Sequence, residues 1–172
     1  MNRLNLMQGM ALGLGLASAA SAQVVVNSNI ATSQTWVNTN VYQLQGEIYV
    51  LPGATLTIQP GTVIRSTTTS SLTISVGAQI FADGTADQPI VWTSTAVNGT
   101  ERVASNEWGN LNVLGDGYIS EDVSPTATPN TPAPNSANRA QMEALTDPVL
   151  SLYGGGNDNH DAGSISFNSL RY

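Results

Sequence analysis

The sequence predicts an all-β fold in which short strands wind into a solenoid, a parallel β-helix. Residues 48–58 (IYVLPGATLTI) and 72–82 (LTISVGAQIFA) are two copies of one unit, in which Gly53 corresponds to Gly77. Apolar and polar residues alternate within both copies, and this pattern is typical of short strands that repeat around a common core. Gly, Pro-Gly or Asp-Gly ends the strands so soon that a sandwich with long hairpins is excluded.

The predicted strands follow one another closely from Val41 to Thr93. Three short strands make one coil, and the alternation places apolar side chains inside and polar ones outside. The strands are expected at residues 41–44, 48–50, 55–58, 62–64, 72–76, 79–82 and 89–93. Equivalent residues of successive coils should stack in an interior lined by Ile48, Val50, Leu56, Ile58, Leu72, Ile74, Ile80 and Ile90.

The N-terminal residues 1–22 have the features of a Sec signal peptide in the expected order. Arg3 provides the positive charge, residues 6–16 form a short apolar core, and Ala20-Ser21-Ala22 is a cleavage site before Gln23. No later segment approaches the ~20 apolar residues of a membrane helix. We therefore expect a mature chain that is secreted or held at the cell surface, without a transmembrane segment.

Residues 23–40 are predicted to lead into the solenoid as a strand or as a cap over its first coil. Trp36 favours a cap, because the end of a solenoid must be covered. Residues 41–172 are then the β-helix coils, interrupted by one long loop insertion.

That insertion is expected at residues 116–162, between a strand near residues 108–115 and another at 164–167. Residues 124–136 (SPTATPNTPAPNS) are rich in proline and should be extended and mobile. Residues 138–145 (NRAQMEAL) can form two turns of helix with Asn138 as the N-cap. Long excursions of this kind often lie on the binding face of a repeat protein.

The strand pattern continues in a shifted phase at residues 170–172, and no polar cap follows. We therefore expect a solenoid that is incomplete at its C-terminus, with further coils of the same protein after Tyr172 or another chain over the exposed end.

Charge and cysteine content exclude several classes of function. The 172 residues carry a net charge of −7. Such a chain repels a phosphate backbone, so nucleic-acid binding is not expected. Cysteine is absent from the sequence, which excludes a disulfide scaffold and a zinc site built on cysteine.

Several segments resemble a group of uncharacterised secreted bacterial proteins. They are GEIYVLPGATLTIQPGTVIR at 46–65, GAQIFADGTADQPIVWTS at 77–94, EWGNLNVLG at 107–115 and YGGGNDNHDAGSISFNSLRY at 153–172. The resemblance implies a right-handed parallel β-helix of the pectin-lyase-like superfamily, export, and a place at the cell surface or outside the cell. Members of this group are usually longer, which implies an N-terminal fragment. The resemblance supplies no catalytic residues.

The densest group of oxygen ligands lies near the end of the chain. Asn157, Asp158, Asn159 and Asp161 are candidate calcium ligands, although the glycine and distal glutamate of an EF-hand are missing. The same residue types build ordinary tight turns, so both interpretations stay open. His160 is the only histidine, and no second histidine or cysteine completes a zinc site. No other cofactor is expected.

Catalytic chemistry has little support in the sequence. A pectate-lyase type of site needs several carboxylates that hold calcium and a basic residue that takes a proton. The predicted strands carry almost no acids, and we interpret Arg65 and Arg171 as solvated surface residues. A sugar-stacking platform is a further option for aromatic residues, although Trp92 and Trp108 are expected to pack inside or against the coil. The candidates for this platform are Tyr42, Tyr49, Trp92, Trp108 and Tyr118.

These observations predict a secreted or cell-surface structural or adhesive β-helix module that has no catalytic residues of its own in this segment. Its expected partners are polysaccharides or cell-surface components. The alternative is the N-terminal part of a carbohydrate-active enzyme, a polysaccharide lyase or a glycoside hydrolase, whose active site lies in later coils.

Overall fold

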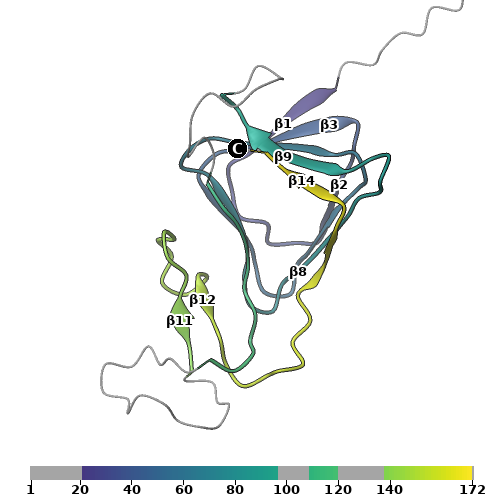
Figure 1. Cartoon of the computed structure of the whole chain (residues 1–172). Coiled ribbons are helices and arrows are strands. Elements are labelled where there is room, and N and C mark those ends of the chain that lie inside the picture. Colours follow the sequence, from purple (N-terminus) through teal and green to yellow (C-terminus); the bar gives the residue numbers. More distant parts are fainter. Residues whose placement is uncertain (1–20, 97–108, 120–137, 172) are drawn as a thin grey trace, which may run out of the picture.

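The computed structural model describes residues 21–96, 109–119 and 138–171, and within them the strands wind into a parallel β-helix of triangular cross-section (Figure 1). The chain turns counterclockwise as it advances towards the viewer of Figure 1, so the helix is right-handed, the hand that crossovers between parallel strands prefer. The predicted fold class is confirmed. The proline-rich residues 124–136, Trp108 and almost all of the predicted signal peptide lie outside the described residues.

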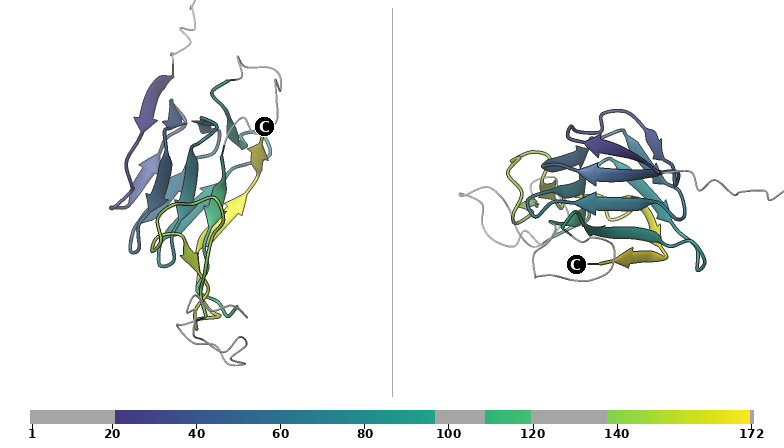
Figure 2. Two further views of the ribbon diagram at one scale, coloured as in Figure 1. Left: turned by 90° about the vertical axis from the view of Figure 1, so that its left-hand side faces the viewer. Right: turned by 90° about the horizontal axis from the view of Figure 1, so that it is seen from above.

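Three parallel sheets form the sides of the described solenoid. Sheet A consists of β1 (Ala22–Val26), β3 (Asn40–Leu44), β6 (Val63–Ser66), β9 (Ile90–Ser94) and β14 (Asn168–Leu170). Sheet B consists of β4 (Glu47–Val50), β7 (Ser71–Ile74) and β10 (Leu111–Val113). Sheet C consists of β2 (Gln34–Trp36), β5 (Thr55–Ile58), β8 (Gln79–Asp83) and β13 (Gly163–Ser166). Figure 2 shows the strands of sheet A side by side when the molecule is seen from above.

Each complete coil after the first contributes one strand to each sheet, and the register confirms the two copies of the repeat. Ile48 pairs with Leu72 between β4 and β7, and Leu56 pairs with Ile80 between β5 and β8. Gly53 and Gly77 occupy equivalent corners with φ of +85° and +84°, a conformation that glycine adopts without a steric penalty. The repeat visible in the sequence is therefore one coil of the solenoid.

Residues 23–40, predicted as a lead-in strand or a cap, provide most of the first coil. β1 pairs with β3, Ile30 bridges to Val50, and β2 pairs with β5. The side chain of Trp36 is 1% exposed and stacks on the Tyr42 ring with centroids 4.5 Å apart. Trp36 therefore packs inside the coil as part of the core.

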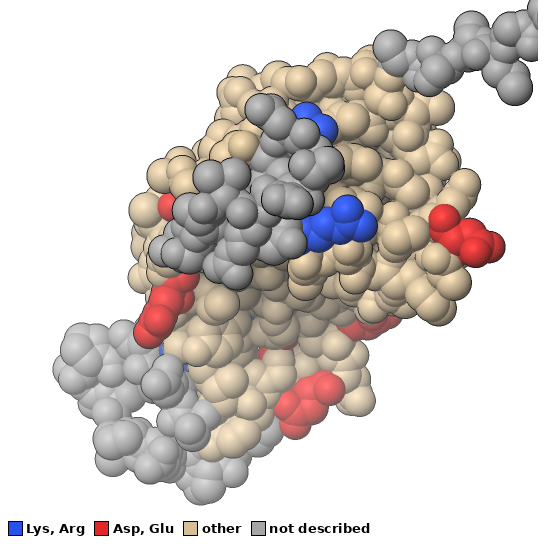
Figure 3. Space-filling model, turned by 45° about the horizontal axis from the view of Figure 1, so that its top comes forward, with Lys and Arg blue, Asp and Glu red and all other residues tan. Residues whose placement is uncertain are grey.

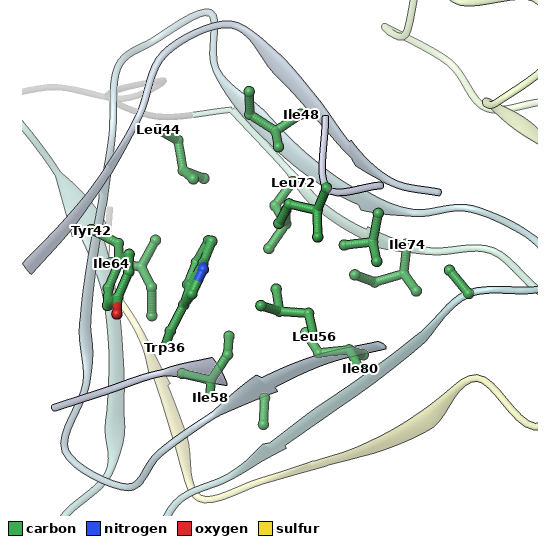
Figure 4. Packing of buried hydrophobic residues seen from close by; sticks show 14 of the residues in the cluster. Trp36, Tyr42, Leu44, Ile48, Leu56, Ile58, Ile64, Leu72, Ile74 and Ile80 are labelled. Atoms are coloured by element: carbon green, nitrogen blue, oxygen red, sulfur yellow. The ribbon is translucent and has the colours of Figure 1, made fainter. Parts of the chain in front are cut away.

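The core fills the space that the three sheets enclose. All eight residues predicted to line the interior are buried, and Trp92 also packs inside. Figure 4 shows Leu72 and Ile74 reaching inwards from one side of the triangle, and Leu56 and Ile80 from another. The predicted stacking of equivalent residues in successive coils is confirmed as well, because the register places Tyr42, Ile64 and Trp92 in one column of sheet A.

Inward-facing side chains of the last described strands are exposed. Val113 is in register with Ile74, and Leu170 is in register with Trp92, so both continue interior columns. Val113 is 42% exposed and Leu170 is 63% exposed, since no described strand stacks on them.

The alternation of inward and outward side chains changes near the end of the sequence because the chain turns a corner between two sheets there. Phe167 separates β13 in sheet C from β14 in sheet A and has a φ of +48°. L-residues other than glycine rarely adopt this left-handed conformation. The chain turns from one sheet to the next at Phe167, and the side-chain alternation restarts after it.

The long excursion leaves the solenoid after β10 and returns at β13, at the corner between sheets B and C (Figure 1). In the two preceding coils, residues 51–54 and 75–78 make the same corner. The N–H of Gly154 donates to the carbonyl of Gly115 at 2.8 Å and closes the base of the excursion. Its described part contains an antiparallel pair, β11 (Ala140–Gln141) and β12 (Leu152–Tyr153).

The helix predicted at residues 138–145 is wrong. Ala140 and Gln141 pair with β12 instead, and Ala144 has a φ of +64°, outside the helical region. The side-chain nitrogen of Asn138 donates to the carbonyl of Ile119 at 3.1 Å. A helix of two turns is only marginally stable by itself. Here the residues pair with a neighbouring strand instead.

Candidate functional site

The excursion packs on the outer face of sheet B. Tyr49 and Thr73 point outwards from this sheet, yet they are 3% and 0% exposed. The hydroxyl of Ser75 donates to the carbonyl of Leu150 at 2.9 Å, which places the excursion directly over β7. The middle strand of sheet B, β7, is thus buried on both faces.

Glu47 joins the excursion to the solenoid through one carboxylate oxygen. Its Oε2 accepts hydrogen bonds from the Tyr49 hydroxyl at 2.8 Å and from the Thr146 N–H and hydroxyl, both at 2.9 Å. We call Glu47, Tyr49 and Thr146 the clasp. The sequence analysis did not single out this group, because Glu47 and Thr146 are 99 residues apart and neither belongs to a motif.

The protonation states of the clasp suit a structural role. Burial raises the pKa of Glu47, but hydrogen bonds from Thr146 and Tyr49 outweigh it and bring this pKa below 4.5. Burial, together with the hydrogen bond to Glu47, raises the pKa of Tyr49 to about 12. Glu47 is therefore ionised and Tyr49 neutral around pH 7, and neither group has the intermediate pKa that suits a general acid or base at that pH.

Replacing Glu47 with glutamine should destabilise the folded protein at pH 7 by about 1 kcal/mol, the value expected for hydrogen bonds to a partly solvated carboxylate. A carboxylate whose pKa is lowered by folding stabilises the protein above its unfolded pKa, and the effect is lost as the pH falls through the folded pKa. The wild type and E47Q should therefore differ in urea unfolding at pH 7 and converge at an acidic pH below the folded-state pKa of Glu47.

Glu143→Gln is the matched control for this measurement, since Glu143 is exposed and lies in the same excursion. It should leave the urea midpoint unchanged at both pH values. Equal midpoints for E47Q and the wild type at pH 7 would show that the clasp contributes nothing.

An ion pair holds the base of the excursion. Nη2 of Arg139 lies 3.0 Å from Oδ1 of Asp116. A Cβ atom at Gly155 would lie 2.1 Å from the same Asp116 oxygen, so a larger residue at this position would displace the ion pair. Asp116 is thus used for anchoring the loop.

The four candidate calcium ligands lie in the turn that leads from the excursion into β13. Oδ1 of Asp158 accepts the N–H of Tyr118 at 2.7 Å, and Oδ1 of Asn157 accepts the N–H of Asn159 at 3.2 Å. Oδ1 of Asp161 accepts the first N–H of β13 at 2.8 Å. The oxygens of Asn157 and Asp161 stabilise local turns, as Asn and Asp commonly do, whereas Asp158 ties the turn to the segment at Tyr118.

No three His, Cys, Asp or Glu side chains come together in the described part of the chain in a way that could hold a metal ion. Nε2 of His160 accepts the N–H of Gly77 at 3.2 Å, so the histidine also ties the turn to the solenoid. Calcium binding at residues 157–161 stays a prediction.

The prediction of a sugar-stacking platform is wrong for three of its five candidate residues. Tyr42, Tyr49 and Trp92 are 5%, 3% and 1% exposed, so their ring faces are not available to a ligand. Trp92 also donates from its indole nitrogen to Oδ1 of Asn168 at 2.7 Å. These aromatic residues serve the core and the interface with the excursion.

Two further carboxylates accept hydrogen bonds from neighbouring donors. Asp83, at the end of β8, accepts the hydroxyls of Ser164 and Ser166, and these bonds lower the pKa of Asp83. Asp147 accepts the N–H groups of Leu150 and Val149, which lower the pKa of Asp147. Asp83 thus joins β13 to β8, whereas Asp147 stabilises the turn that follows it.

Arg65 and Arg171 lie on the outer face of sheet A. Arg65 is in register with Gln43 and Thr93, outward-facing residues of the flanking strands. The N–H of Arg171 donates to the carbonyl of Trp92, which extends the pairing of β14 and β9 and places Arg171 next to Thr93. The structure brings together two residues that are 106 positions apart in the sequence.

Comparison with known proteins gives one match. A family model described as a pectate-lyase like beta helix domain matches residues 28–172. No curated protein and no solved structure matches the chain. Among the described residues, no helix is long and apolar enough to cross a membrane.

Proposed function

Because the chain belongs to the family of pectate-lyase like beta helix domains, we propose that it acts as an exported structural or adhesive β-helix module. In this proposal the coils present a binding surface for polysaccharides or other cell-surface components. The chemistry of a lyase or hydrolase is not carried by the residues of this segment. The proposal of export rests on the features of residues 1–22.

The structural roles of the described carboxylates support this proposal. Glu47, Asp83, Asp116 and Asp158 each accept a hydrogen bond or form an ion pair that joins one part of the fold to another. Glycoside hydrolases need two carboxylates that face one glycosidic bond across a cleft, free to exchange protons or attack. These four carboxylates instead fasten loops and strands, which is the task of a scaffold.

Outward-facing residues of the solenoid also suit a binding module. Thr55, Thr57 and Gln79 are uncharged, polar residues on the outer face of sheet C. Hydroxyl and amide groups can donate and accept hydrogen bonds, as the hydroxyls of a sugar chain do. A regular sheet of such groups can hold a polymer without reacting with it.

Purified residues 23–172 should show the circular dichroism of a β-sheet and should bind an insoluble polysaccharide without cutting it. We expect no unsaturated product from polygalacturonate, with or without calcium. A calcium-dependent rise in ultraviolet absorbance from these residues would overturn the proposal and favour the alternative, a carbohydrate-active enzyme. A folded protein that is retained by none of a panel of polysaccharides would contradict the adhesive role.

A further inference from the structure

The peptide bond between Asp147 and Pro148 lies in the described part of the excursion, beside a carboxylate that is held in place. The N–H groups of Val149 and Leu150 donate to Oδ1 of Asp147 at 2.9 Å and 2.8 Å. Pro148 is exposed, so water and acid from the solvent can reach the bond. The carboxylate and the carbonyl group of Asp147 are therefore neighbours in a fixed and accessible turn.

The carbonyl oxygen of Asp147 accepts two hydrogen bonds from one residue, Ser151. The N–H of Ser151 donates to this oxygen at 3.3 Å, and the hydroxyl of Ser151 donates to it as well. Ser151 is 0% exposed, so solvent does not compete for its hydroxyl. Two donors on one carbonyl oxygen stabilise the negative charge that the oxygen acquires when a nucleophile attacks the carbonyl carbon. Ser151 thus gives this carbonyl group the surroundings of an oxyanion hole.

The clasp fixes the same residue against sheet B. Thr146 is held by Glu47, and the main chain of Asp147 forms a hydrogen bond with the hydroxyl of Tyr49. Glu47 and Tyr49, both on β4, are the titratable groups that interact with the charge of Asp147. At mildly acidic pH Glu47 is ionised and Tyr49 is neutral, so a proton for a reaction at this bond comes from the solvent.

One carboxylate is enough for chemistry at this bond. A side-chain carboxylate can attack the carbonyl carbon of its own residue, because both groups are already in one molecule and the attack closes a small ring. Hydrogen bonds from Leu150 and Val149 lower the pKa of Asp147, so the carboxylate stays in its nucleophilic, ionised form at mildly acidic pH. Figure 3 shows Asp and Glu side chains in separate places on one face of the molecule, and this reaction does not require them to meet.

We propose that the chain cleaves itself between Asp147 and Pro148, with the Asp147 carboxylate as the nucleophile and Ser151 as the residue that stabilises the oxyanion. Oδ2 of Asp147 forms a bond to the carbonyl carbon of the same residue, and the bond from this carbon to the nitrogen of Pro148 breaks. The proline nitrogen takes a proton from the solvent and leaves as a secondary amine. One water molecule then opens the cyclic anhydride and gives the two carboxyl groups of a C-terminal Asp147. This inference does not rest on the proposed function.

Cleavage at this bond would change how the excursion sits on sheet B. The new α-carboxylate of Asp147 would lie near the ionised Glu47, and like charges repel. The two pieces would stay together, because β12 pairs with β11, and β13 and β14 pair with β8 and β9. Self-cleavage would therefore loosen the clasp and uncover Tyr49 without taking the solenoid apart, which makes it an irreversible switch.

Incubation of purified residues 23–172 at about pH 5, followed by mass spectrometry of the denatured sample, tests the inference. We expect one fragment that ends at Asp147 and one that begins at Pro148. A synthetic peptide of residues 142–153 contains the same bond without the fold, and the folded protein should be cleaved about tenfold faster than this peptide. The rate should rise from about pH 7 to about pH 5, because the leaving nitrogen needs a proton. Circular dichroism confirms that the protein is folded at each pH.

Three variants separate the roles of the residues. Asp147→Asn keeps an oxygen that accepts the N–H groups of Val149 and Leu150 but removes the carboxylate, and it should abolish cleavage. Ser151→Ala should slow cleavage about tenfold, since one donor to the oxyanion is lost. Ser151→Cys keeps the shape of the buried side chain with a weaker donor, so it gives an intermediate rate and replaces S151A if that variant does not fold. Glu143→Gln is the matched control, because Glu143 is exposed in the same excursion, and its rate should equal that of the wild type.

Any of four results would overturn the inference. They are no cleavage of the folded protein, a peptide that is cleaved as fast as the folded protein, cleavage that persists in D147N, and a rate that the folded Ser151 variants do not change. Failure of the proposed function is distinct from all of these, since it would appear as cleavage of a polysaccharide or as a lack of retention on every polysaccharide of the panel.

Discussion

Replacing Gly163 with alanine should destabilise the protein by about 3 kcal/mol, because the new side chain meets the main chain of the neighbouring coil. A Cβ atom at Gly163 would lie 1.9 Å from the carbonyl oxygen of Ile80 and 2.7 Å from its carbonyl carbon. Gly163 also has a φ of +103°, which disfavours any L-side chain. Relief of the clash requires β13 to move away from β8, and this movement breaks the pairing that closes the fourth coil. Urea unfolding followed by circular dichroism measures the effect.

Gly115→Ala is the control for this variant. Gly115 also lies at the base of the excursion, but a Cβ atom there would have no atom within 4 Å and its φ is not positive. Its unfolding free energy should stay within about 0.5 kcal/mol of the wild type. If G163A is insoluble while G115A is soluble and folded, the steric explanation is supported. Equal stability of the two variants would refute it.

Replacing Trp36 with alanine should cost about 3–5 kcal/mol, the range measured for large aromatic residues in closed cores. The ring is 1% exposed and stacks on Tyr42 with an interplanar angle of 9°. Its loss leaves a cavity in the first coil and removes the stacking contact, which adds to the cost of the lost burial. The variant should unfold at a markedly lower urea concentration with an unchanged slope.

Phe81→Ala provides the comparison, since Phe81 lies in the same sheet but points outwards and is 37% exposed. It should cost less than about 1.5 kcal/mol, because only part of the ring is removed from water on folding. A Phe81 variant that is destabilised as much as W36A would contradict the assignment of Trp36 to the closed core.

The solenoid could be predicted because its coils repeat locally. Ile48 and Leu72 occupy the same place in two copies of one sequence unit, and they are paired in the structure. Alternation within each strand then separates interior from exterior residues, as the buried positions of Leu56 and Ile80 confirm. Both signals arise from neighbours in the sequence, so one sequence is enough to detect them.

The interface between the excursion and sheet B could not be predicted in the same way. Thr146 contacts Glu47 across 99 residues, and neither residue stands out by type or spacing. The helix expected at residues 138–145 failed for the same reason, because the strand that pairs with Ala140 lies outside the window that a propensity argument considers. The column that joins Arg65 to Arg171 also depends on a pairing that only the fold reveals.

The place where the excursion leaves the coil determines what it costs the chain in loop-closure entropy. Leu56 pairs with Ile80, 24 residues later, whereas Ile80 pairs with Gly163, 83 residues later. Closing a loop costs free energy in proportion to the logarithm of its length, so the longer closure costs only about 1 kcal/mol more than the shorter one. The clasp at Glu47 contributes about the same amount in the opposite direction. A β-helix can therefore carry a long insertion at one corner with almost no net loss of stability, provided that the insertion makes one good contact with the coil beside it.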